Sequence, residues 1–515
     1  MRTAVLQSSF SRGKTLNKEN LYRTAAYVTI FSVAEKFFGF LYRIILSRTL
    51  GSEGMGLYQL SLSVFAVLVT ATSSGIPLTV SRLITKHRTR NNKKAEHATV
   101  TAALVCVLAF SIPVFCILFF GHDLFDFIFS DPRCMSLLMI LLPALTFNSV
   151  YSVLRGALWG NKKFVPYCVI DLIEELCMIA MGVFLVSNMT SVFDGARRIA
   201  FAIVFSYLVS FTLAMIYYFV KGGQLADPRK QLSPLLSSAL PITGMRTSSS
   251  LINTAISLIL PARLIASGMT SAEAMSGIGV VMGMSMPVLS IPATLIGSLA
   301  LVMVPELAEN FYRGNHVKLK DNIEKALKIT CLIACALIPI LFALGEDLGI
   351  ILFGNEECGR IIRRCCFMLL PTSIAMITTS ILNSIGFEKQ TCGFFFVGAA
   401  ATLLCTWFLP NYIGIYAQIA GMASSALITC ILNLYLIVKK SKEKVCFFKH
   451  TLICAASILP VCLLGTLLRN LFVSIMPYFP AVLLAGAILL AADALFLFAL
   501  GLAEPKWAKL LVKRT

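Results

Sequence analysis

Charged side chains within strongly apolar segments are the part of this sequence that could do chemistry. Glu35, Lys36 and Arg43 lie in the apolar stretch 24–47. On an α-helix, Lys36 and Arg43 lie within about 20° of each other, and Glu35 lies about 80–100° away. An ionisable residue in a membrane span normally faces protein or a water-filled cavity. We therefore expect Lys36 and Arg43 to bind an anion in a cavity, with Glu35 as a partner. Gly39, between them, leaves room for a close helix or a ligand.

Three carboxylates occupy the apolar stretch 166–188. Asp171 and Glu175 share a helix face, and Glu174 lies about 60° away from it. These acids could bind a coupling cation, Na+ or H+, or they could pair with basic residues and hold helices in register. The sequence leaves both interpretations open.

A third polar group interrupts the stretch 235–265. Arg246 is followed by Thr247–Ser250 and then by Asn253, where a lipid-facing helix would be apolar. Such a segment is typical of a helix that lines a cleft. The predicted binding residues are therefore Lys36, Arg43, Arg246 and Asn253. Weaker candidates, near span ends or in the last span, are Arg155, Arg263 and Asp493.

The elements that must position these residues are membrane helices. The chain has 515 residues, of which 57% are hydrophobic and 13% are charged, with a mean hydropathy of +0.83. Soluble domains have about 25% charged residues, and apolar runs of about 20 residues span a bilayer. The composition predicts an all-α polytopic membrane protein. Fourteen spans are expected near residues 24–47, 57–85, 98–120, 134–156, 166–188, 198–220, 235–265, 274–303, 324–345, 363–386, 392–411, 414–438, 450–471 and 479–502.

The positions of Lys and Arg predict the orientation, because short basic loops are retained in the cytoplasm. An even number of spans places both termini on one side of the cell membrane, and we expect that side to be cytoplasmic. The basic connections are then inside, at 87–97, 161–163, 312–320, 439–444 and the tail 506–515. The acidic or mixed connections are outside, at 122–131, 191–198 and 345–360.

An internal repeat relates the two halves of the chain. Arg48 precedes Pro77 by 29 residues, and Arg263 precedes Pro292 by the same number. Both prolines follow an isoleucine, and a Leu-Leu-Pro run recurs at 141–143 and 369–371. Six spans in each copy make the repeat parallel. The predicted organisation is a cytoplasmic tail at 1–23, a first lobe at 24–220, a second lobe at 221–438, and two further helices with a tail at 439–515.

Enzymatic and metal chemistry find no support in the sequence. The sixteen cysteines show no metal or redox spacing and mostly lie in apolar runs, so we expect them to be core residues. There is no HExxH, GxSxG or phosphate-binding glycine loop. We predict no catalytic residue, no metal and no cofactor. The net charge of +19 fits cytoplasmic loops facing anionic lipid, so nucleic acid is not an expected partner.

Five stretches of the sequence resemble a known transporter family. They are GFLYRIILSRTLGSEGMGLYQL (39–60), SGIPLTVSRL (74–83), LRGALWGNKKFVPYCVIDLIEE (154–175), PITGMR (241–246) and SMPVLSIPATL (285–295). They are similar to the stage V sporulation protein B-like branch of the polysaccharide flippases, in the multidrug/oligosaccharidyl-lipid/polysaccharide (MOP) exporter superfamily. The resemblance implies a MATE-like fold of fourteen helices in two lobes and export of lipid-linked saccharides. It also implies that Arg43 and Arg246 occupy family-typical positions and that Glu174 belongs to an acidic motif of the fifth span. The lipid II branch carries an arginine and a glutamate before the eighth-span proline, whereas residues 285–292 carry no charge.

The leading functional hypothesis is a flippase. It would move an undecaprenyl-pyrophosphate-linked saccharide, a cell-wall, spore-cortex or polysaccharide precursor, from the inner to the outer leaflet by alternating access. The partners are then the lipid-linked saccharide, membrane lipids and cell-wall synthesis proteins, and we expect a monomer. Two alternatives stay open: a cation-coupled multidrug or metabolite antiporter of the same fold, and a non-transporting scaffold for envelope assembly.

Overall fold

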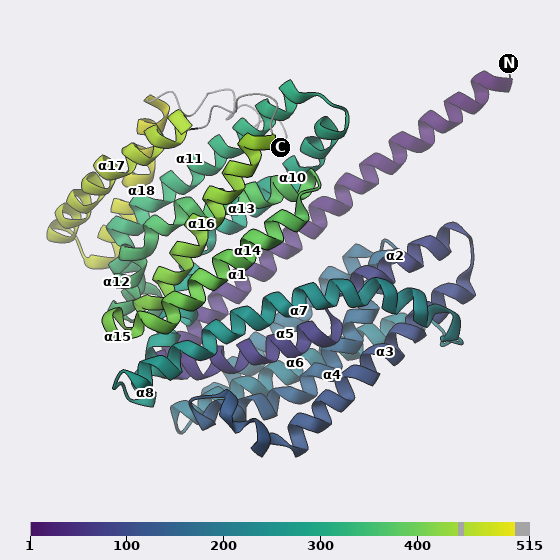
Figure 1. Ribbon diagram of the computed structural model, residues 1–515, viewed down its shortest axis with the longest axis horizontal. Coiled ribbons are helices and arrows are strands. Elements are labelled where there is room, and N and C mark those ends of the chain that lie inside the picture. Colours follow the sequence, from purple (N-terminus) through teal and green to yellow (C-terminus); the bar gives the residue numbers. More distant parts are fainter. Residues whose placement is uncertain (1, 441–447, 500–515) are drawn as a thin grey trace. The chain divides into compact units, whose positions relative to one another are not determined.

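The computed structural model describes residues 2–440 and 448–499, and within these ranges the chain is helical with no strand (Figure 1). This confirms the predicted all-α class. The contacts divide the chain into two compact units, one up to Leu258 and one from Ile259 onward. The division falls inside α7 (Arg229–Ala266), later than the predicted lobe boundary at 220. Residues 441–447 and 500–515, which carry part of the predicted cytoplasmic charge, lie outside the described residues.

The first unit contains six α-helices and most of α7. They are α1 (Arg2–Ser73), α2 (Ile76–Thr89), α3 (Lys93–Phe120), α4 (Pro132–Gly160), α5 (Phe164–Val186) and α6 (Val192–Val220), with a short 3-10 helix η1 (His122–Ile128). Residues 2–23, predicted as a tail, are part of the α1 helix.

The second unit contains more and shorter helices. They are α8 (Ser271–Ile278), α9 (Met286–Leu289), α10 (Ile291–Tyr312), α11 (His316–Leu348), α12 (Glu356–Cys365), α13 (Leu369–Ser384), α14 (Glu388–Phe408), α15 (Pro410–Ile413), α16 (Tyr416–Lys440), α17 (Phe448–Ile475) and α18 (Tyr478–Ala499). The π-helices η2 (Gly279–Ser285) and η3 (Gly349–Phe353) and the 3-10 helix η4 (Cys366–Met368) lie between them.

Polar side chains at the sequence positions before the apolar runs fix where the helices begin. An N-cap side chain accepts a hydrogen bond from a free N–H of the first turn. Such caps are made by Asn92, Asp131, Ser191, Thr270 and Asn315. At Asp131 the cap is followed by Pro132 at the first helical position, where a missing N–H costs nothing.

Twelve stretches of the described residues are long and apolar enough to cross a membrane, so the chain is a multi-pass membrane protein. The first stretch, Ile30–Thr89, has 60 residues and covers two predicted spans. The α1 backbone departs from helical geometry inside it at Gly51, whose φ of 66° favours glycine. The α5 helix is not among the twelve, since it carries three carboxylates. The number of fourteen spans stays a prediction.

In two predicted spans the helical hydrogen bonding is interrupted at equivalent places, which the sequence analysis did not predict. The span 57–85 is interrupted at Ser74 and Gly75, before α2, and the span 274–303 is interrupted at Ser290, before α10. In each case the proline of the repeated Ile-Pro pair occupies the first turn of the new helix. Proline has no N–H and so removes a helical hydrogen bond, although Gly75 and Ser290 keep right-handed helical backbone angles. The repeated sequence signal is therefore a repeated interruption of helical hydrogen bonding at a proline, called a helix break below.

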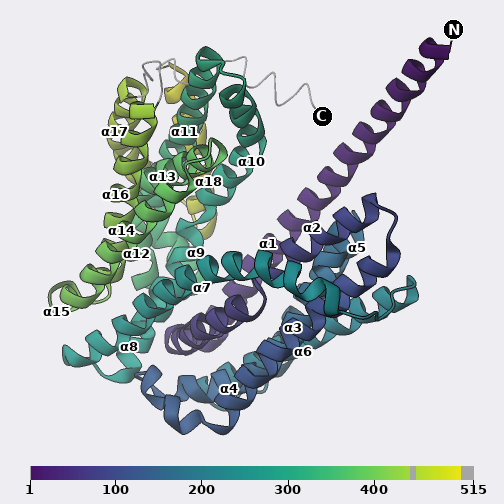
Figure 2. The same cartoon turned by 45° about the vertical axis from the view of Figure 1, so that its right-hand side comes forward.

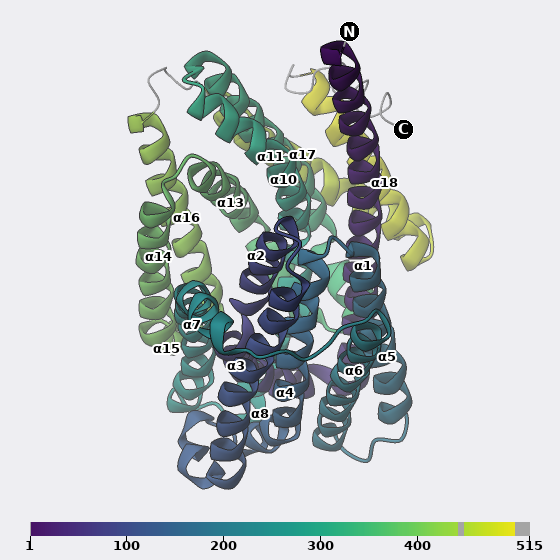
Figure 3. The ribbon, with the colours of Figure 1, turned by 90° about the vertical axis from the view of Figure 1, so that its right-hand side faces the viewer.

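The packing inside each unit agrees with the repeat. In the first unit α4 packs against α2, α3 and α6, and α5 lies beside α6 (Figure 3). In the second unit α13 packs against α10, α11 and α16, and α14 lies beside α16. Small, apolar and thiol side chains fill these contacts. Nine of the described cysteines are buried as predicted, and all of the described cysteines are free thiols.

The last two helices belong to the second unit through a buried ion pair. The α17 helix packs against α11 and α18 (Figure 2). Asp347 of α11 is fully buried and accepts from Arg469 Nη2 at 2.6 Å and from the Tyr478 hydroxyl at 2.6 Å. Apolar side chains of the same three helices, among them Leu344 and Leu489, form a buried cluster. The helices α17 and α18 are therefore held by specific polar contacts as well as by apolar packing.

Candidate functional site

A buried charge cluster joins α4 and α5 in the first unit. Arg155 Nη2 donates to both carboxylate oxygens of Asp171, at 3.0 Å each. The Tyr151 hydroxyl also donates to Asp171 Oδ1. The guanidinium carbon lies 5.2 Å from the ring centroids of Tyr151 and Tyr167, within cation–π range. Asp171 is 8% exposed, so this carboxylate is neutralised by its neighbours and not by water.

The short connection between α4 and α5 explains why these residues meet. The α4 helix ends at Gly160 and α5 begins at Phe164, so the two helices form a helical hairpin. Arg155 is five residues before that end and Asp171 is seven residues after that start. With a rise of about 1.5 Å per residue, they stand at similar heights in an antiparallel pair. This spacing identifies Arg155, one of the candidates predicted near span ends.

The other α5 carboxylates reach different neighbours. Glu175 approaches α1, where a Cβ on Gly39 would lie only 3.0 Å from its Oε1. Gly39 therefore allows a close helix contact, one of the two roles predicted for it. Glu174 has a buried Oε2 with no hydrogen-bond partner among the described residues. Ser210 of α6 lies near this carboxyl group.

Glu35 connects α1 to this cluster. It is half-buried and close enough to Asp171, Arg155 and Lys36 for Coulombic interactions. Glu35 is also close enough to Glu175 for a Coulombic interaction between the two carboxyl groups. The structure thus brings together the four predicted acids, Glu35, Asp171, Glu174 and Glu175, around one end of the α4–α5 hairpin, with Arg155 as the paired cation.

The predicted basic residues of α1 have no ion pair among the described residues. Lys36 is exposed, and its described neighbour of opposite charge is Glu35. Arg43 is half-buried and lies near Tyr58, beyond the Gly51 kink of α1. Both cations therefore differ from Arg155, whose charge is neutralised by a bidentate contact.

Arg246 lies at the helix break between α1 and α2. Its Nη1 donates to the Ser74 carbonyl at 2.9 Å, while the rest of the side chain is exposed. One turn earlier in α7, Thr243 Oγ1 accepts from the Gly75 N–H at 3.1 Å. Gly75 is required here, because a Cβ would lie 2.5 Å from the Ala239 carbonyl oxygen. The break is therefore held by α7, and α2 begins without a side-chain cap.

Asn253 is exposed on α7, and no side-chain partner holds it in the described part of the chain. It belongs to the first unit with Lys36, Arg43 and Arg246, although Arg246 and Asn253 were predicted in the second lobe. Whether these four residues bind a substrate stays a prediction.

Comparison with models of protein families shows which family the chain belongs to. A model of the family described as polysaccharide biosynthesis protein matches residues 21–311, more than half of the chain. The chain belongs to this family. The match runs from residue 21, inside α1, to residue 311, near the end of α10, and so includes the charge cluster and both helix breaks. The predicted resemblance to the polysaccharide flippase group of the MOP exporters is confirmed.

The chain is also distantly similar to individual bacterial proteins. Stage V sporulation protein B of Bacillus subtilis (strain 168) is 23% identical over 360 residues, which cover 66% of this chain and 68% of that protein. The lipid II flippase MurJ of the same organism is 22% identical over 370 residues, covering 65% and 66%. The transport proteins among these relatives agree with the prediction that the chain is not an enzyme.

Solved structures share the fold. A lipid II flippase MurJ in an inward closed conformation matches with a TM-score of 0.69 at 15% identity, covering 92% of this chain and 99% of that one. An inward-facing MATE family multidrug resistance transporter matches with a TM-score of 0.66 at 16% identity, covering 82% and 95%. The MATE/MOP-like fold predicted from the sequence is confirmed.

Proposed function

We propose that this polysaccharide biosynthesis family member is a flippase for a lipid-linked saccharide with an anionic diphosphate headgroup, an undecaprenyl-pyrophosphate-linked precursor. The observation that carries the proposal is the difference between the cations of the first unit. Arg155 is neutralised by Asp171, whereas Lys36, Arg43 and Arg246 have no ion pair among the described residues. Unpaired cations within membrane helices are costly unless a ligand or water compensates them.

The break before α2 adds a second element for an anion. Backbone N–H groups at an interrupted helix lack a helical partner, and Thr243 satisfies one of them, that of Gly75. The α2 helix begins beside the exposed Arg246 guanidinium and has no side-chain cap. Broken helices in membrane transporters commonly line substrate sites. The headgroup phosphates would contact Arg246 and Arg43, while the prenyl chain stays in the lipid.

Transport would follow alternating access, with the termini on the cytoplasmic side and the headgroup moving outward. A negative interior favours outward movement of an anion by about 2.3 kcal/mol per charge per 100 mV. The fold shared with the MurJ flippase and the MATE transporters supports this type of motion. The names of the relatives, which include a lipid II flippase, support a lipid-linked substrate in general.

The four carboxylates favour cation coupling, with Na+ or H+ as the coupling ion. Glu174 and Glu175 lie on α5 beside the neutralised Asp171, and the buried Oε2 of Glu174 has no partner among the described residues. A buried carboxyl group of this kind exchanges a proton or a cation more readily than a paired one. The same acids favour the second candidate function, a cation-coupled multidrug or metabolite antiporter.

A proteoliposome experiment separates these functions. Purified protein is reconstituted, and translocation is measured for a fluorescent prenyl-diphosphate disaccharide and for a cationic dye. The proposal predicts movement of the lipid-linked saccharide, faster when the membrane potential is negative on the side that the headgroup leaves. Movement of the dye alone would support the antiporter, and movement of neither would support an envelope-assembly scaffold.

A further inference from the structure

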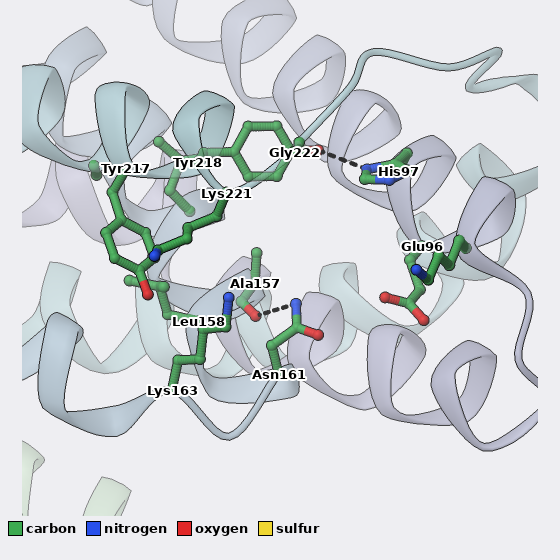
Figure 4. Close-up of a pocket in the computed structure, with 14 residues that line it drawn as sticks. Glu96, His97, Ala157, Leu158, Asn161, Lys163, Tyr217, Tyr218, Lys221 and Gly222 are labelled. Atoms are coloured by element: carbon green, nitrogen blue, oxygen red, sulfur yellow. Dashed lines mark hydrogen bonds between the residues drawn. The ribbon is translucent and has the colours of Figure 1, made fainter.

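A small cavity with a basic wall lies at the ends of α3, α4 and α6, and none of its lining residues belongs to the charge cluster (Figure 4). Its volume is about 210 Å³. Lys93, Lys163 and Lys221 line it from three different elements, and Glu96 and His97 lie on the side opposite Lys163 and Lys221. Its floor consists of apolar side chains of α4 and α6, such as Leu158 and Ala214.

Two of the lysines share one aromatic ring. The Lys163 ammonium lies 5.6 Å from the Tyr217 ring centroid and the Lys221 ammonium lies 5.9 Å from it. Neither ammonium has an ion pair in the described ranges, and Glu96 has none there either. Like charges that converge on one ring repel each other, so a bound anion would stabilise both.

The wall around His97 is held in place by hydrogen bonds. The Gln224 N–H donates to His97 Nδ1 at 3.3 Å, and the Tyr218 hydroxyl donates to the Gln224 carbonyl at 3.1 Å. Because Nδ1 accepts from a backbone donor, the neutral imidazole carries its proton on Nε2. The segment after α6 is thereby fixed against α3.

The backbone at the rim of the cavity is unusual. Lys162 has a φ of 56°, an uncommon conformation for a residue with a long side chain. Its N–H donates to the Trp159 carbonyl at 3.0 Å, and the next N–H, of Lys163, donates to the Leu158 carbonyl at 2.9 Å. This tight turn brings Lys163 to the cavity wall.

A wider basic groove continues from the cavity. It shares Lys93, Glu96 and Asn161 with the cavity and adds Arg88, Arg90 and Lys94. The Arg88 guanidinium donates to the Asn161 carbonyl at 2.8 Å, which ties the end of α2 to the α4–α5 turn. A ligand in the cavity would therefore lie in a region of strongly positive potential.

We propose that this cavity binds the phosphate group of an anionic ligand at the predicted cytoplasmic face of the membrane. Three ammonium groups suit a phosphate, the apolar floor and the tyrosines suit the glycerol and upper acyl carbons of a phospholipid, and basic pockets between membrane helices bind anionic headgroups. The site is separate from the substrate site proposed above and does not depend on it.

The test measures binding to the full-length protein in neutral detergent. The ligands are a short-chain phosphatidylglycerol, the matching phosphatidylcholine and inorganic phosphate. The test variant is K163Q/K221Q, which changes two exposed side chains. The matched control is K439Q/K440Q, because Lys439 and Lys440 are also exposed and also lie over aromatic rings, at 5.6 and 5.7 Å.

The proposal predicts that phosphatidylglycerol binds more tightly than phosphatidylcholine. It also predicts that K163Q/K221Q weakens phosphatidylglycerol binding about 10- to 30-fold, while K439Q/K440Q does not. Competition by inorganic phosphate would identify a soluble anion as a ligand, and its failure would identify the lipid headgroup. Equal weakening in both double variants, with unchanged thermal unfolding, would overturn the proposal, because it would mean that only general surface charge attracts the lipid.

Discussion

Arg155 and Asp171 face each other across the α4–α5 hairpin, with Arg155 Nη2 at 3.0 Å from both carboxylate oxygens. Because Asp171 is buried, removing its cation leaves an uncompensated charge. Arg155→Ala should lower the free energy of unfolding by about 3 kcal/mol. The double variant R155L/D171L should be less destabilised than either single variant. Thermal unfolding of the purified protein measures both effects.

The matched control for this prediction is the pair Arg198 and Asp194, which is partly exposed on α6. Arg198→Ala should cost less than about 1 kcal/mol. If Arg155→Ala and Arg198→Ala were equally mild, the α4–α5 cluster would not contribute to stability as described.

Gly182 of α5 and Tyr42 of α1 approach closely enough to test the α1–α5 contact. A Cβ on Gly182 would lie 2.0 Å from the Tyr42 hydroxyl oxygen. Gly182→Ala should therefore destabilise the protein by about 1–3 kcal/mol. Tyr42→Phe alone should be mild, since this buried hydroxyl has no described partner. Adding Tyr42→Phe to Gly182→Ala should recover part of the loss in thermal unfolding, and a lack of recovery would show that the two residues do not meet.

The helix break at Gly75 can be tested with a matched glycine. Gly75→Ala places a methyl group 2.5 Å from the Ala239 carbonyl oxygen and should displace α7. Gly244 lies on α7, the helix that also carries Ala239, and a Cβ on Gly244 would have no atom within 4 Å. We expect Gly75→Ala to lower both the unfolding temperature and the transport rate. Gly244→Ala should leave the rate unchanged and stabilise α7 by up to about 1 kcal/mol. Equal behaviour of the two variants would argue against a packed break.

Asp347 tests the attachment of the last two helices. Asp347→Asn keeps the side-chain shape but leaves Arg469 without its charge partner, so we expect a loss of about 3 kcal/mol in unfolding free energy. Glu309→Gln is the control, because its pair with Arg313 is exposed and should contribute less than about 1 kcal/mol. An unchanged unfolding temperature for Asp347→Asn would mean that apolar packing alone holds α17 and α18.

The sequence predicted the helical class and the approximate positions of the spans, because an apolar run of about 20 residues has the length of a helix that crosses a bilayer. It also predicted the close approach at Gly39 and the repeated prolines. It did not predict that the prolines interrupt the spans. A proline can bend a helix or end it, and the outcome depends on neighbouring contacts such as that of Thr243 with Gly75.

Pairing of distant charges was harder to predict. Arg469 and Asp347 are 122 positions apart, and nothing local to either residue indicates the other. The Arg155–Asp171 pair could have been inferred from the hairpin spacing. Distinguishing paired cations from unpaired ones requires side-chain positions, and this distinction supports the proposed role of Lys36 and Arg43.

The most direct test of the proposed function is the rate at which a fluorescent prenyl-diphosphate disaccharide crosses proteoliposome membranes, compared for wild type, Arg43→Gln and the exposed-arginine control Arg48→Gln. A charge-assisted hydrogen bond contributes about 1.5–3 kcal/mol, so Arg43→Gln should slow translocation about tenfold or more at an unchanged unfolding temperature. Arg48→Gln should translocate at nearly the wild-type rate. Wild-type vesicles no faster than protein-free vesicles, or an Arg43→Gln rate equal to that of wild type, would contradict this account.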